Sequence, residues 1–545
     1  MPPLFIYFIL PAQTYNGDHY RREVRPVKNL IVMIPDGTSI SVVSAARWYG
    51  IYNGTGGENL AVDPYFCGTV KTFSSNAPIG DSAPTTSAYM TGMPQQTGNI
   101  AIYPPADTVN DLVPVDGSMA YNPLATIPEA MRLEQGKAIG LVVTVEFPHA
   151  TPADCSAHYH KRSNYGVISS QMAYQNLDVM FGGGNDFVSD DMKRHFRNKG
   201  IAYYSDDIEA FRNHDSGKVW ALWCGEAMPY DIDRDKDRIP SLREMTEKAL
   251  ELLSRQINGF FLMVEGSKVD WAAHDNDAVG CITEYLAFDD AVAAALEFAV
   301  KDGDTAVIIL PDHGNSGFSI GRNDLKSYDK AGIDDLFGSI SGYRRTGRGL
   351  EKILLDEKPD SFREVIRIYT GIDITDKEFE DLMTAGNYKN GYSEKAGSES
   401  LATKLTRIMN GRTWFGFTTG GHTGEEVFLA AYHPYGDLPM GMNTNMEINR
   451  YLCDVAGLEK RLPEVTSEIF ACHTEVFEGF KCNIRYSEDN FPVLEVKKGR
   501  QTLRIPAHTS IGYLNGSEFD LGSLAVYMDK TGMFYLPRSL REIFK

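Results

Sequence analysis

Ser82 directly follows Asp81 in the segment PIGDSAPTTSAYMTG (residues 78–92). Small residues, an early Pro84 and a closing Gly92 predict a short helix whose first turn holds Ser82. Ordinary helix punctuation would explain this pattern. Alternatively, Ser82 is a nucleophile, because the N–H groups and dipole at a helix N-terminus favour anions such as phosphate. A serine hydroxyl is a weak nucleophile until a base or a metal ion removes its proton, so this second interpretation requires such a partner elsewhere.

The segment VEGSKVDWAAHDND places Asp270 and His274 four residues apart, on one face of a predicted helix. A carboxylate and an imidazole at this spacing could bind zinc, although a surface contact between them would have the same spacing. His422, in the glycine-flanked segment TTGGHTGEE, offers a third ligand. Together the three residues would leave the open fourth position that is typical of catalytic zinc.

Further acids, histidines and a threonine follow predicted strands, at positions where a core should stay apolar: Asp36 after LIVMI, His149 and Thr151 after LVVTVEFP, Glu265 after FFLMV, and Asp312 and His313 after AVIILP. Each carboxylate alone could be only a helix cap. Because the carboxyl ends of parallel strands meet at one edge of a sheet, we expect these side chains to converge.

Asp36, Asp312 and His313 would form a second set of three zinc ligands, whose open position Ser82 could fill. Two ions about 3.5–4 Å apart can clamp both the attacking and the leaving oxygens of a phosphoryl displacement. A hydroxyl on a metal ion also loses its proton far more easily than a free one. The partner that Ser82 requires is therefore predicted to be a metal ion.

Glu265, Thr151 and a second oxygen of Asp36 form an oxygen-only set, which suits magnesium. Arg162, in HYHKRSNYG, offers a planar fork for two phosphate oxygens. A surface basic residue beside Lys161 is the alternative interpretation of Arg162. The predicted cofactors are thus two zinc ions and one magnesium ion.

Near-continuous apolar runs predict the strands that position these residues, at 27–34, 137–145, 259–266 and 304–312. Amphipathic stretches such as 241–256 and 284–300 lie between them. This alternation is typical of an α/β three-layer sandwich with a central, mostly parallel sheet.

The composition changes along the chain and predicts the domain organisation. Residues 21–463 form the catalytic domain, within which 316–415 are charged, glycine-punctuated and helical or irregular in patches, as in an insertion. Residues 464–545 have short alternating strands with NG and DKTG turns, which predict a small β-rich domain. Residues 1–20 contain an apolar run without a basic start, as in a signal-peptide remnant or a disordered N-terminus. We therefore expect an extracytoplasmic protein, either periplasmic or secreted.

The formal charge of −20 argues against nucleic acid as the main partner. No stretch approaches 18 apolar residues, so no membrane span is expected. Seven cysteines without CxxC pairs indicate neither a zinc ribbon nor a dense disulfide framework. Cys472 and Cys482 could form one disulfide or remain isolated thiols.

The chain resembles the metal-dependent alkaline phosphatases, through motifs in the family's order: IPDGTS (34–39), DSAPTTSAYMTG (81–92), HATPAD (149–154), FGGGND (181–186), VEGSKVDWAAH (264–274), PDHG (311–314) and GGHTGEE (420–426). The resemblance implies that Ser82 forms a covalent phosphoserine, hydrolysed with net retention at phosphorus, and that Arg162 binds phosphate. It also implies the two zinc sets and the magnesium set named above.

The sequence departs from the family pattern at a few positions. His149 and Trp271 stand where some bacterial members have Asp and Lys, whereas other members carry the histidine and some carry the tryptophan. The resemblance places both residues near the phosphate, and they bear on the identity of the third metal. The insertion is similar to a variable region that supplies dimer contacts or a crown near the active site, so a homodimer is possible.

The resemblance predicts hydrolysis of small phosphate monoesters. A phosphodiesterase or a sulfatase of the same superfamily is an alternative, but the CxPxR-like motif of sulfatases is absent around Ser82. An inactive, metal-stabilised surface-binding protein, with the C-terminal region as its functional part, is another. The presence of Ser82, Arg162 and all the histidine ligands favours an active monoesterase.

Overall fold

The computed structural model describes residues 23–54, 59–386, 399–487 and 491–544. The predicted signal-peptide remnant at residues 1–20 lies outside the described residues. No helix in the described part of the chain is long and apolar enough to cross a membrane.

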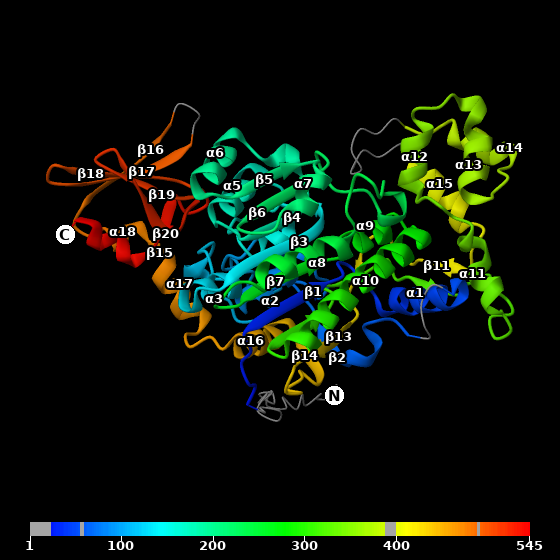
Figure 1. The fold of residues 1–545 in the computed structure, drawn as a ribbon, viewed down its shortest axis with the longest axis horizontal. Helices are drawn as coiled ribbons and strands as arrows, with labels where there is room; N and C mark the ends of the chain where they lie inside the picture. Colours follow the sequence, from blue (N-terminus) through cyan, green and yellow to red (C-terminus); the bar gives the residue numbers. More distant parts are fainter. Residues whose placement is uncertain (1–22, 55–58, 387–398, 488–490, 545) are drawn as a thin grey trace, which may run out of the picture.

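A ten-stranded sheet forms the centre of the molecule (Figure 1). Its strands lie side by side in the order β14 (Gly441–Thr444), β2 (Phe66–Lys71), β13 (Val427–Tyr432), β8 (Thr305–Ile309), β1 (Asn29–Ile34), β7 (Phe260–Glu265), β3 (Ala138–Glu146), β4 (Val179–Gly183), β6 (Val219–Trp223) and β5 (Ala202–Ser205). Strand β13 is antiparallel to both of its neighbours, and the other pairs are parallel. The predicted, mostly parallel sheet is therefore confirmed.

Helices cover both faces of this sheet, which is why its strands read as continuous apolar runs. In β1, Ile31 and Met33 belong to one hydrophobic core, whereas Leu30, Val32 and Ile34 belong to the core on the opposite face. The first core is covered by α1 (Ile40–Asn53), α8 (Leu242–Leu253) and α10 (Ala278–Asp302), and the second by α2 (Ser82–Thr91), α3 (Ile127–Gln135), α5 (Tyr165–Tyr174) and α16 (Asn445–Ala456). This arrangement is the predicted three-layer sandwich.

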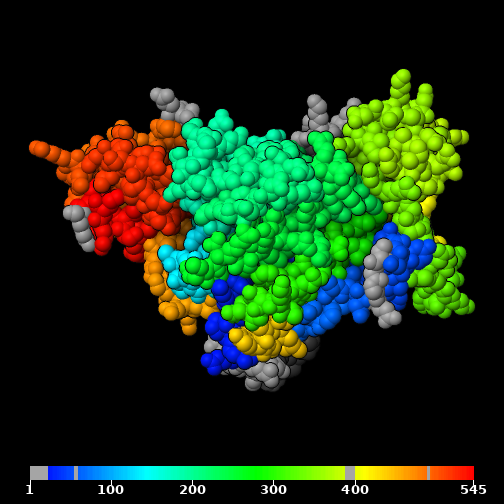
Figure 2. All heavy atoms as spheres, in the orientation of Figure 1, coloured from blue at the N-terminus to red at the C-terminus, as the bar shows by residue number. Residues whose placement is uncertain are grey.

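The segment predicted to be an insertion contains several helices at one end of the molecule (Figures 1 and 2): α11 (Ile333–Ser341), α12 (Gly347–Leu354), α13 (Phe362–Thr370), α14 (Asp376–Leu382) and α15 (Leu401–Asn410). Its two ends meet, because β10 (Ser319–Ile320) pairs with β11 (Phe415–Gly416). The segment therefore leaves and rejoins the central domain at nearly the same place.

The C-terminal region forms an antiparallel sheet with its own hydrophobic core, at the other end of the molecule (Figure 2). Its strands lie in the order β15 (Ala471–Cys472), β21 (Met533–Leu536), β20 (Ser517–Met528), β19 (Thr509–Leu514), β18 (Gln501–Pro506), β17 (Pro492–Lys498) and β16 (Lys481–Tyr486). The predicted β-rich appendage is confirmed.

All seven cysteines are free thiols. Cys472 lies in β15 and Cys482 in β16, and these strands are at opposite ends of the seven-strand order. The possible disulfide between them is therefore not formed, because five strands separate their backbones.

Candidate metal centre and phosphate site

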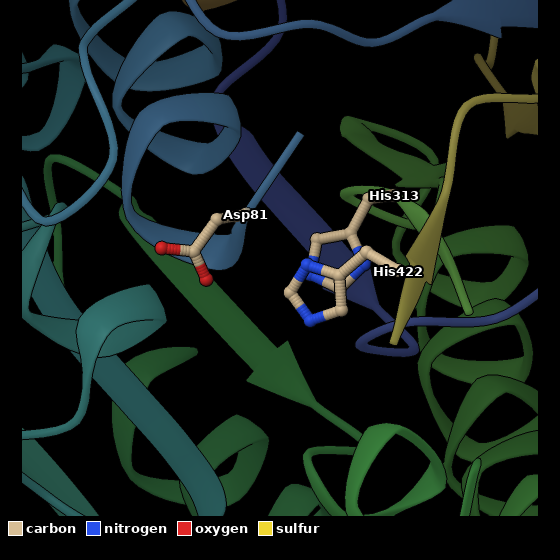
Figure 3. Close-up of side chains that lie close together, drawn as sticks. All are labelled: Asp81, His313 and His422. Atoms are coloured by element: carbon tan, nitrogen blue, oxygen red, sulfur yellow. The ribbon is translucent and has the colours of Figure 1, made fainter. Parts of the chain in front are cut away.

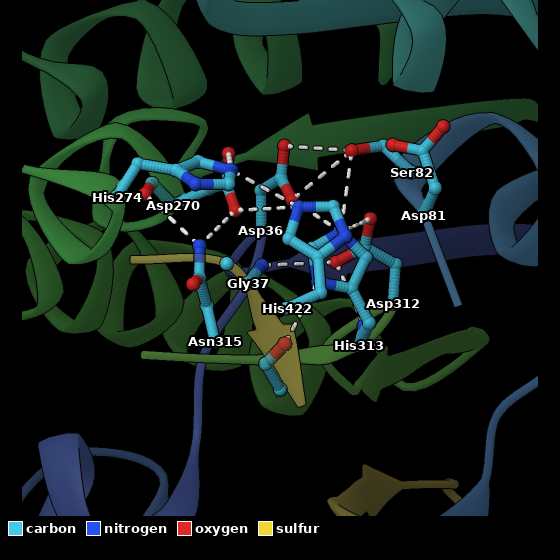
Figure 4. Close-up of polar contacts among 12 residues, drawn as sticks. Asp36, Gly37, Asp81, Ser82, Asp270, His274, Asp312, His313, Asn315 and His422 are labelled. Atoms are coloured by element: carbon cyan, nitrogen blue, oxygen red, sulfur yellow. Dashed lines mark hydrogen bonds and ion pairs between the residues drawn. The ribbon is translucent and has the colours of Figure 1, made fainter. Parts of the chain in front are cut away.

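Three adjacent strands of the central sheet bring the predicted carboxylates together at one edge, and Figure 4 shows two of them, Asp36 and Asp312. Strand β1 lies between β7 and β8, and its last residue, Ile34, is in register with Glu265, the last residue of β7. Asp36 follows β1 by two residues, and Asp312 follows β8 by three. All three carboxylates are fully buried. The predicted convergence at the carboxyl ends of the strands is what the structure shows.

The first predicted zinc set is assembled from two distant segments. Helix α9 (Lys268–His274) carries Asp270 and His274, and His422 begins the short strand β12 (His422–Thr423), which pairs with β9 (Gly314–Asn315). The Nε2 atoms of His274 and His422 are 3.0 Å apart, and they lie 3.4 and 3.6 Å from the two carboxylate oxygens of Asp270. These ligand atoms are close enough to hold one metal ion.

The hydrogen bonds of the histidines fix which nitrogen is available. The Nδ1 atoms of His274, His422 and His313 lie 2.8, 2.9 and 3.1 Å from the carbonyl oxygens of Gly420, Gly80 and Gly314. A carbonyl oxygen only accepts, so each Nδ1 carries a proton, and the lone pair that each ring can offer to a metal ion lies at Nε2. Two lone pairs at 3.0 Å repel one another unless a cation lies between them, so this set fits a metal ion.

The second predicted set surrounds His313. Its Nε2 atom lies 3.4 Å from Asp36 Oδ1 and 3.4 Å from Asp312 Oδ2. Asp312 Oδ1 accepts the backbone N–H groups of Gly37 and His313, whereas Asp312 Oδ2 is buried without a hydrogen-bond partner. Burial lowers the pKa of His313, which favours the neutral imidazole that binds metal ions. An orphaned buried carboxylate oxygen beside an imidazole also fits a metal ligand set.

Ser82 is the first residue of α2 and lies against this second set. Its Oγ is 3.4 and 3.5 Å from the two carboxylate oxygens of Asp36 and 3.3 Å from His313 Nε2. The side chain is 2% exposed. The N-terminus of α2 therefore aims the Ser82 hydroxyl into the centre of the cluster.

Asp81 does not cap α2 with its side chain. Its carboxylate instead accepts a hydrogen bond from Arg162 Nη1 at 2.5 Å, while Arg162 Nη2 lies 3.0 Å from His149 Nε2. Against the effect of burial, the Arg162 guanidinium lowers the pKa of Asp81 to about 2. Asp81 therefore occupies the N-cap position that helix punctuation predicts, but its side chain pairs with Arg162 and does not cap the helix. The Arg162 side chain is 26% exposed, and its ion pair joins it to Asp81, the residue directly before Ser82.

Asp81 also lies near the two histidines that belong to different predicted zinc sets. His313 and His422 are stacked with ring centroids 3.8 Å apart, and together with Asp81 they could hold a metal ion (Figure 3). Asp81 was not among the predicted ligands. The two zinc sets are therefore contiguous, with Asp81 at their edge.

Asp36 and Glu265, from the third predicted set of oxygen ligands, lie beside the imidazole of His149. Glu265 Oε2 accepts a hydrogen bond from Ser267, while Glu265 Oε1 and Thr151 Oγ1 are buried without partners. Asp36, Glu265 and His149 are close enough to share one ion. The sequence placed His149 near the phosphate but did not predict it as a ligand. Trp271 lies beside it, with ring centroids 6.4 Å apart.

The carboxylates repel one another in the absence of a cation. Burial, followed by the charges of Asp312 and Asp270, raises the pKa of Asp36 well above its usual range. Burial also raises the pKa of Glu265 to about 8. Buried carboxylates are stable as anions only when they are paired or coordinate a metal ion. The donor set therefore fits bound cations.

Sequence reasoning missed the residues that orient the ligands. Asn315 Nδ2 donates to Asp270 Oδ1 at 2.7 Å. Ser39 Oγ donates to Glu425 Oε1 at 2.5 Å and accepts the backbone N–H of Asn315 at 3.2 Å. Asn315 lies two residues after His313, so its position close to a predicted ligand was the available signal.

Two features of the structure require glycine at position 37. Its φ is +58°, and an added Cβ would lie 2.4 Å from Asp270 Oδ1. We expect Gly37→Ala to displace Asp270 and to release the predicted zinc ion. We also expect kcat/KM for an aryl phosphate monoester to fall by about 100-fold or more, since a misplacement of 1 Å can lower the rate by that much. Elemental analysis and steady-state kinetics check both effects.

Gly54→Ala is the matched control, because Gly54 has a φ of +60° but no atom of the described residues within 4 Å of an added Cβ. Both variants acquire about 1–2 kcal/mol of backbone strain. Equal losses of activity in the two variants would show that strain, and not the contact with Asp270, is responsible.

Comparison with known families agrees with this geometry. A family model described as alkaline phosphatase matches residues 27–458. Alkaline phosphatase 3 of Bacillus subtilis is 35% identical over 441 residues, which cover 77% of this chain and 87% of the relative. The repressible alkaline phosphatase of Saccharomyces cerevisiae is 26% identical over 501 residues, which cover 81% and 83% of the two chains.

Solved structures show the same likeness. The cold-active alkaline phosphatase from Shewanella sp. superposes with a TM-score of 0.67 at 27% identity, over 78% of this chain and 99% of that one. The matched residues of the family model include every predicted ligand, Ser82 and Arg162. The chain therefore belongs to the alkaline phosphatase family.

Proposed function

We propose that this phosphomonoesterase acts through a covalent phosphoserine on Ser82, with two zinc ions and one magnesium ion as cofactors. Asp270, His274 and His422 would hold the first zinc, and Asp36, Asp312 and His313 the second. The observation that carries the proposal is the position of Ser82 Oγ, which lies within 3.5 Å of both Asp36 and His313. Ions in these sets would lower the pKa of bound hydroxyl groups and neutralise charge on the phosphoryl oxygens.

The chain's own groups would bind and orient the phosphate. The Arg162 guanidinium has a planar fork that can donate to two phosphoryl oxygens, and its ion pair with Asp81 holds it beside Ser82. Ser82 Oγ loses its proton and attacks phosphorus, the bond to the ester oxygen breaks, and the alkoxide takes up a proton and leaves as the alcohol. Water then attacks phosphorus, the bond to Ser82 Oγ breaks, Ser82 regains a proton and inorganic phosphate leaves, so two displacements give net retention at phosphorus.

Asp36, Thr151 and Glu265 would hold the magnesium ion. His149 adds an imidazole nitrogen close to this set, although its Nε2 lies within hydrogen-bond distance of Arg162. Oxygen donors favour magnesium, whereas a nitrogen ligand shifts a site towards zinc. Arg162 engages only Nε2 of His149, and Nδ1 is buried without a hydrogen-bond partner among the described residues. The assignment of magnesium therefore rests on the oxygen donors of Asp36, Thr151 and Glu265.

The proposal also covers the substrate, the oligomeric state and the location of the enzyme. The proposed substrates are small phosphate monoesters. The enzyme is proposed to be a homodimer located outside the cytoplasm. The apolar N-terminal run in the sequence supports export.

Hydrolysis of an aryl phosphate monoester and of the matching diester, at alkaline pH, tests the proposal. We expect the monoester to be preferred, chelation to abolish turnover, and zinc with magnesium to restore it. Elemental analysis should find two zinc ions and one magnesium ion per chain.

Preference for the diester would instead identify a phosphodiesterase of the same superfamily. No turnover of either ester, with the metals bound, would identify an inactive, metal-stabilised binding protein.

A further inference from the structure

The C-terminal sheet contacts the chain segment that carries Arg162. This segment, His158–Arg162, connects α4 (Ala150–Ala153) to α5. On one side, Tyr159 and Ile100 exchange backbone hydrogen bonds, and the N–H of Arg162 donates to the carbonyl of Gly98 at 2.7 Å. On the other side lies the C-terminal sheet, whose strand β19 packs against α5 (Figure 1). The segment is therefore held between two parts of the chain that are distant in sequence.

Asp529, in the DKTG turn between β20 and β21, makes the first contact from the sheet. Its Oδ1 lies 2.7 Å from His160 Nε2. Burial and the nearby Asp529 carboxylate raise the pKa of Tyr159 to about 12. The rings of Tyr159 and His160 are in contact, with centroids 4.5 Å apart. One carboxylate thus lies against two consecutive residues, the second of which is two residues before Arg162.

His508 makes the second contact, through Gln171 of α5. His508 is 3% exposed, and burial lowers its pKa to about 3, so its imidazole is neutral. Its Nδ1 lies 3.0 Å from Gln171 Nε2, which can donate to it. Gln171 Nε2 also donates to the carbonyl of His158 at 3.0 Å, and Gln171 Oε1 accepts the N–H of His158 at 2.7 Å. The sheet is therefore connected by hydrogen bonds to the backbone at the start of the segment.

We propose that the C-terminal sheet is a positioning element for the phosphate-binding arginine, with Asp529 and His508 as positioning residues. This proposal rests on the proposed role of Arg162. Asp81 and His149 contact the guanidinium nitrogens of Arg162. The backbone position of Arg162, in contrast, depends on the contacts of the segment His158–Arg162. Bidentate recognition of a phosphate tolerates displacements of about 0.5 Å, so the contacts behind the segment affect binding.

The same sheet offers a matched control. Asp520 of β20 forms an ion pair with Lys199, at the end of α6 (Asp190–Lys199), at 2.6 Å. Asp520 and Asp529 are both half-exposed. Both carboxylates join the sheet to the central domain, but only Asp529 contacts the segment that carries Arg162.

The experiment compares Asp529→Ala and Asp520→Ala in the full-length, metal-loaded protein. For Asp529→Ala we expect KM for an aryl phosphate and the inhibition constant of inorganic phosphate to rise about 3- to 10-fold, with a smaller change in kcat. For Asp520→Ala we expect changes below about 2-fold in both constants. The two variants should have similar melting temperatures, and Asp529→Asn, which keeps an acceptor oxygen, should recover part of the phosphate affinity.

Combination with Arg162→Ala distinguishes positioning from a general effect on the fold. If Asp529 acts through Arg162, then Asp529→Ala should have no further effect in the Arg162→Ala background. Equal effects of the two aspartate variants, or an undiminished effect in that background, would overturn the inference and leave the proposed function intact. If the single variant Arg162→Ala keeps the KM and the phosphate inhibition constant of the wild type, the proposed role of the arginine itself is refuted.

Discussion

Replacing Ser82 with alanine should lower kcat for an aryl phosphate monoester by at least about 10³-fold, because the substitution removes the proposed nucleophile. The zinc content should remain, since each zinc set keeps its three Asp and His ligands. Acid quenching during turnover of a labelled monoester should trap phosphoprotein in the wild type but not in Ser82→Ala. These measurements separate loss of the nucleophile from loss of the metals.

Thr86→Val is the control on the same helix. Thr86 is fully buried in α2, its Oγ1 has no hydrogen-bond partner, and valine has nearly the same shape. We expect this variant to retain activity within about 2-fold, as for a nearly isosteric change without a lost hydrogen bond. Phosphoprotein in the Ser82→Ala variant, or turnover close to that of the wild type, would show that another group attacks phosphorus.

Asp270→Ala should have the second large effect. The Asp270 carboxylate lies between His274 and His422, and its removal leaves two imidazole lone pairs 3.0 Å apart without an anionic ligand. We expect one zinc ion to be lost on dialysis and kcat/KM to fall by about 10³-fold or more, since the ligand and not merely its support is gone.

Asn315→Ala provides a graded comparison for Asp270→Ala. It removes the 2.7 Å hydrogen bond to Asp270 Oδ1 but keeps every proposed ligand. Loss of such an outer partner typically lowers metal affinity or activity by 10- to 100-fold, so we expect an effect of about that size. Full zinc occupancy and unchanged kinetics in Asp270→Ala would remove Asp270 from the first zinc set.

The sequence alone was sufficient to predict the fold class and the types of residue in the candidate site. Each predicted strand was visible as a local apolar run, because a strand buried on both faces by helices needs apolar side chains at every position. The edge at which Asp36, Glu265 and Asp312 meet followed from the same runs, since parallel strands end on one side. The ordered motifs then indicated the family, which the comparisons confirmed.

The tertiary structure decided the partners of these residues. His274 and His422 are 148 residues apart, and their approach depends on the pairing of β12 with β9, which no local pattern encodes. The same holds for Asp81, which could cap α2 but pairs with Arg162 from 81 residues away. A short-range pattern fixes the conformation of a segment, whereas its partner depends on how the segments pack.

The C-terminal region illustrates the same distinction. Its turns and alternating strands predicted a small β-rich unit, because strand periodicity and turn chemistry are local properties. The free thiols of Cys472 and Cys482 follow from a strand order that puts β15 and β16 at opposite ends of the sheet. The contact of Asp529 with His160 likewise depends on how this sheet docks against the central domain. The sequence determined the elements and the chemistry of their side chains, and only long-range packing determined which side chains meet.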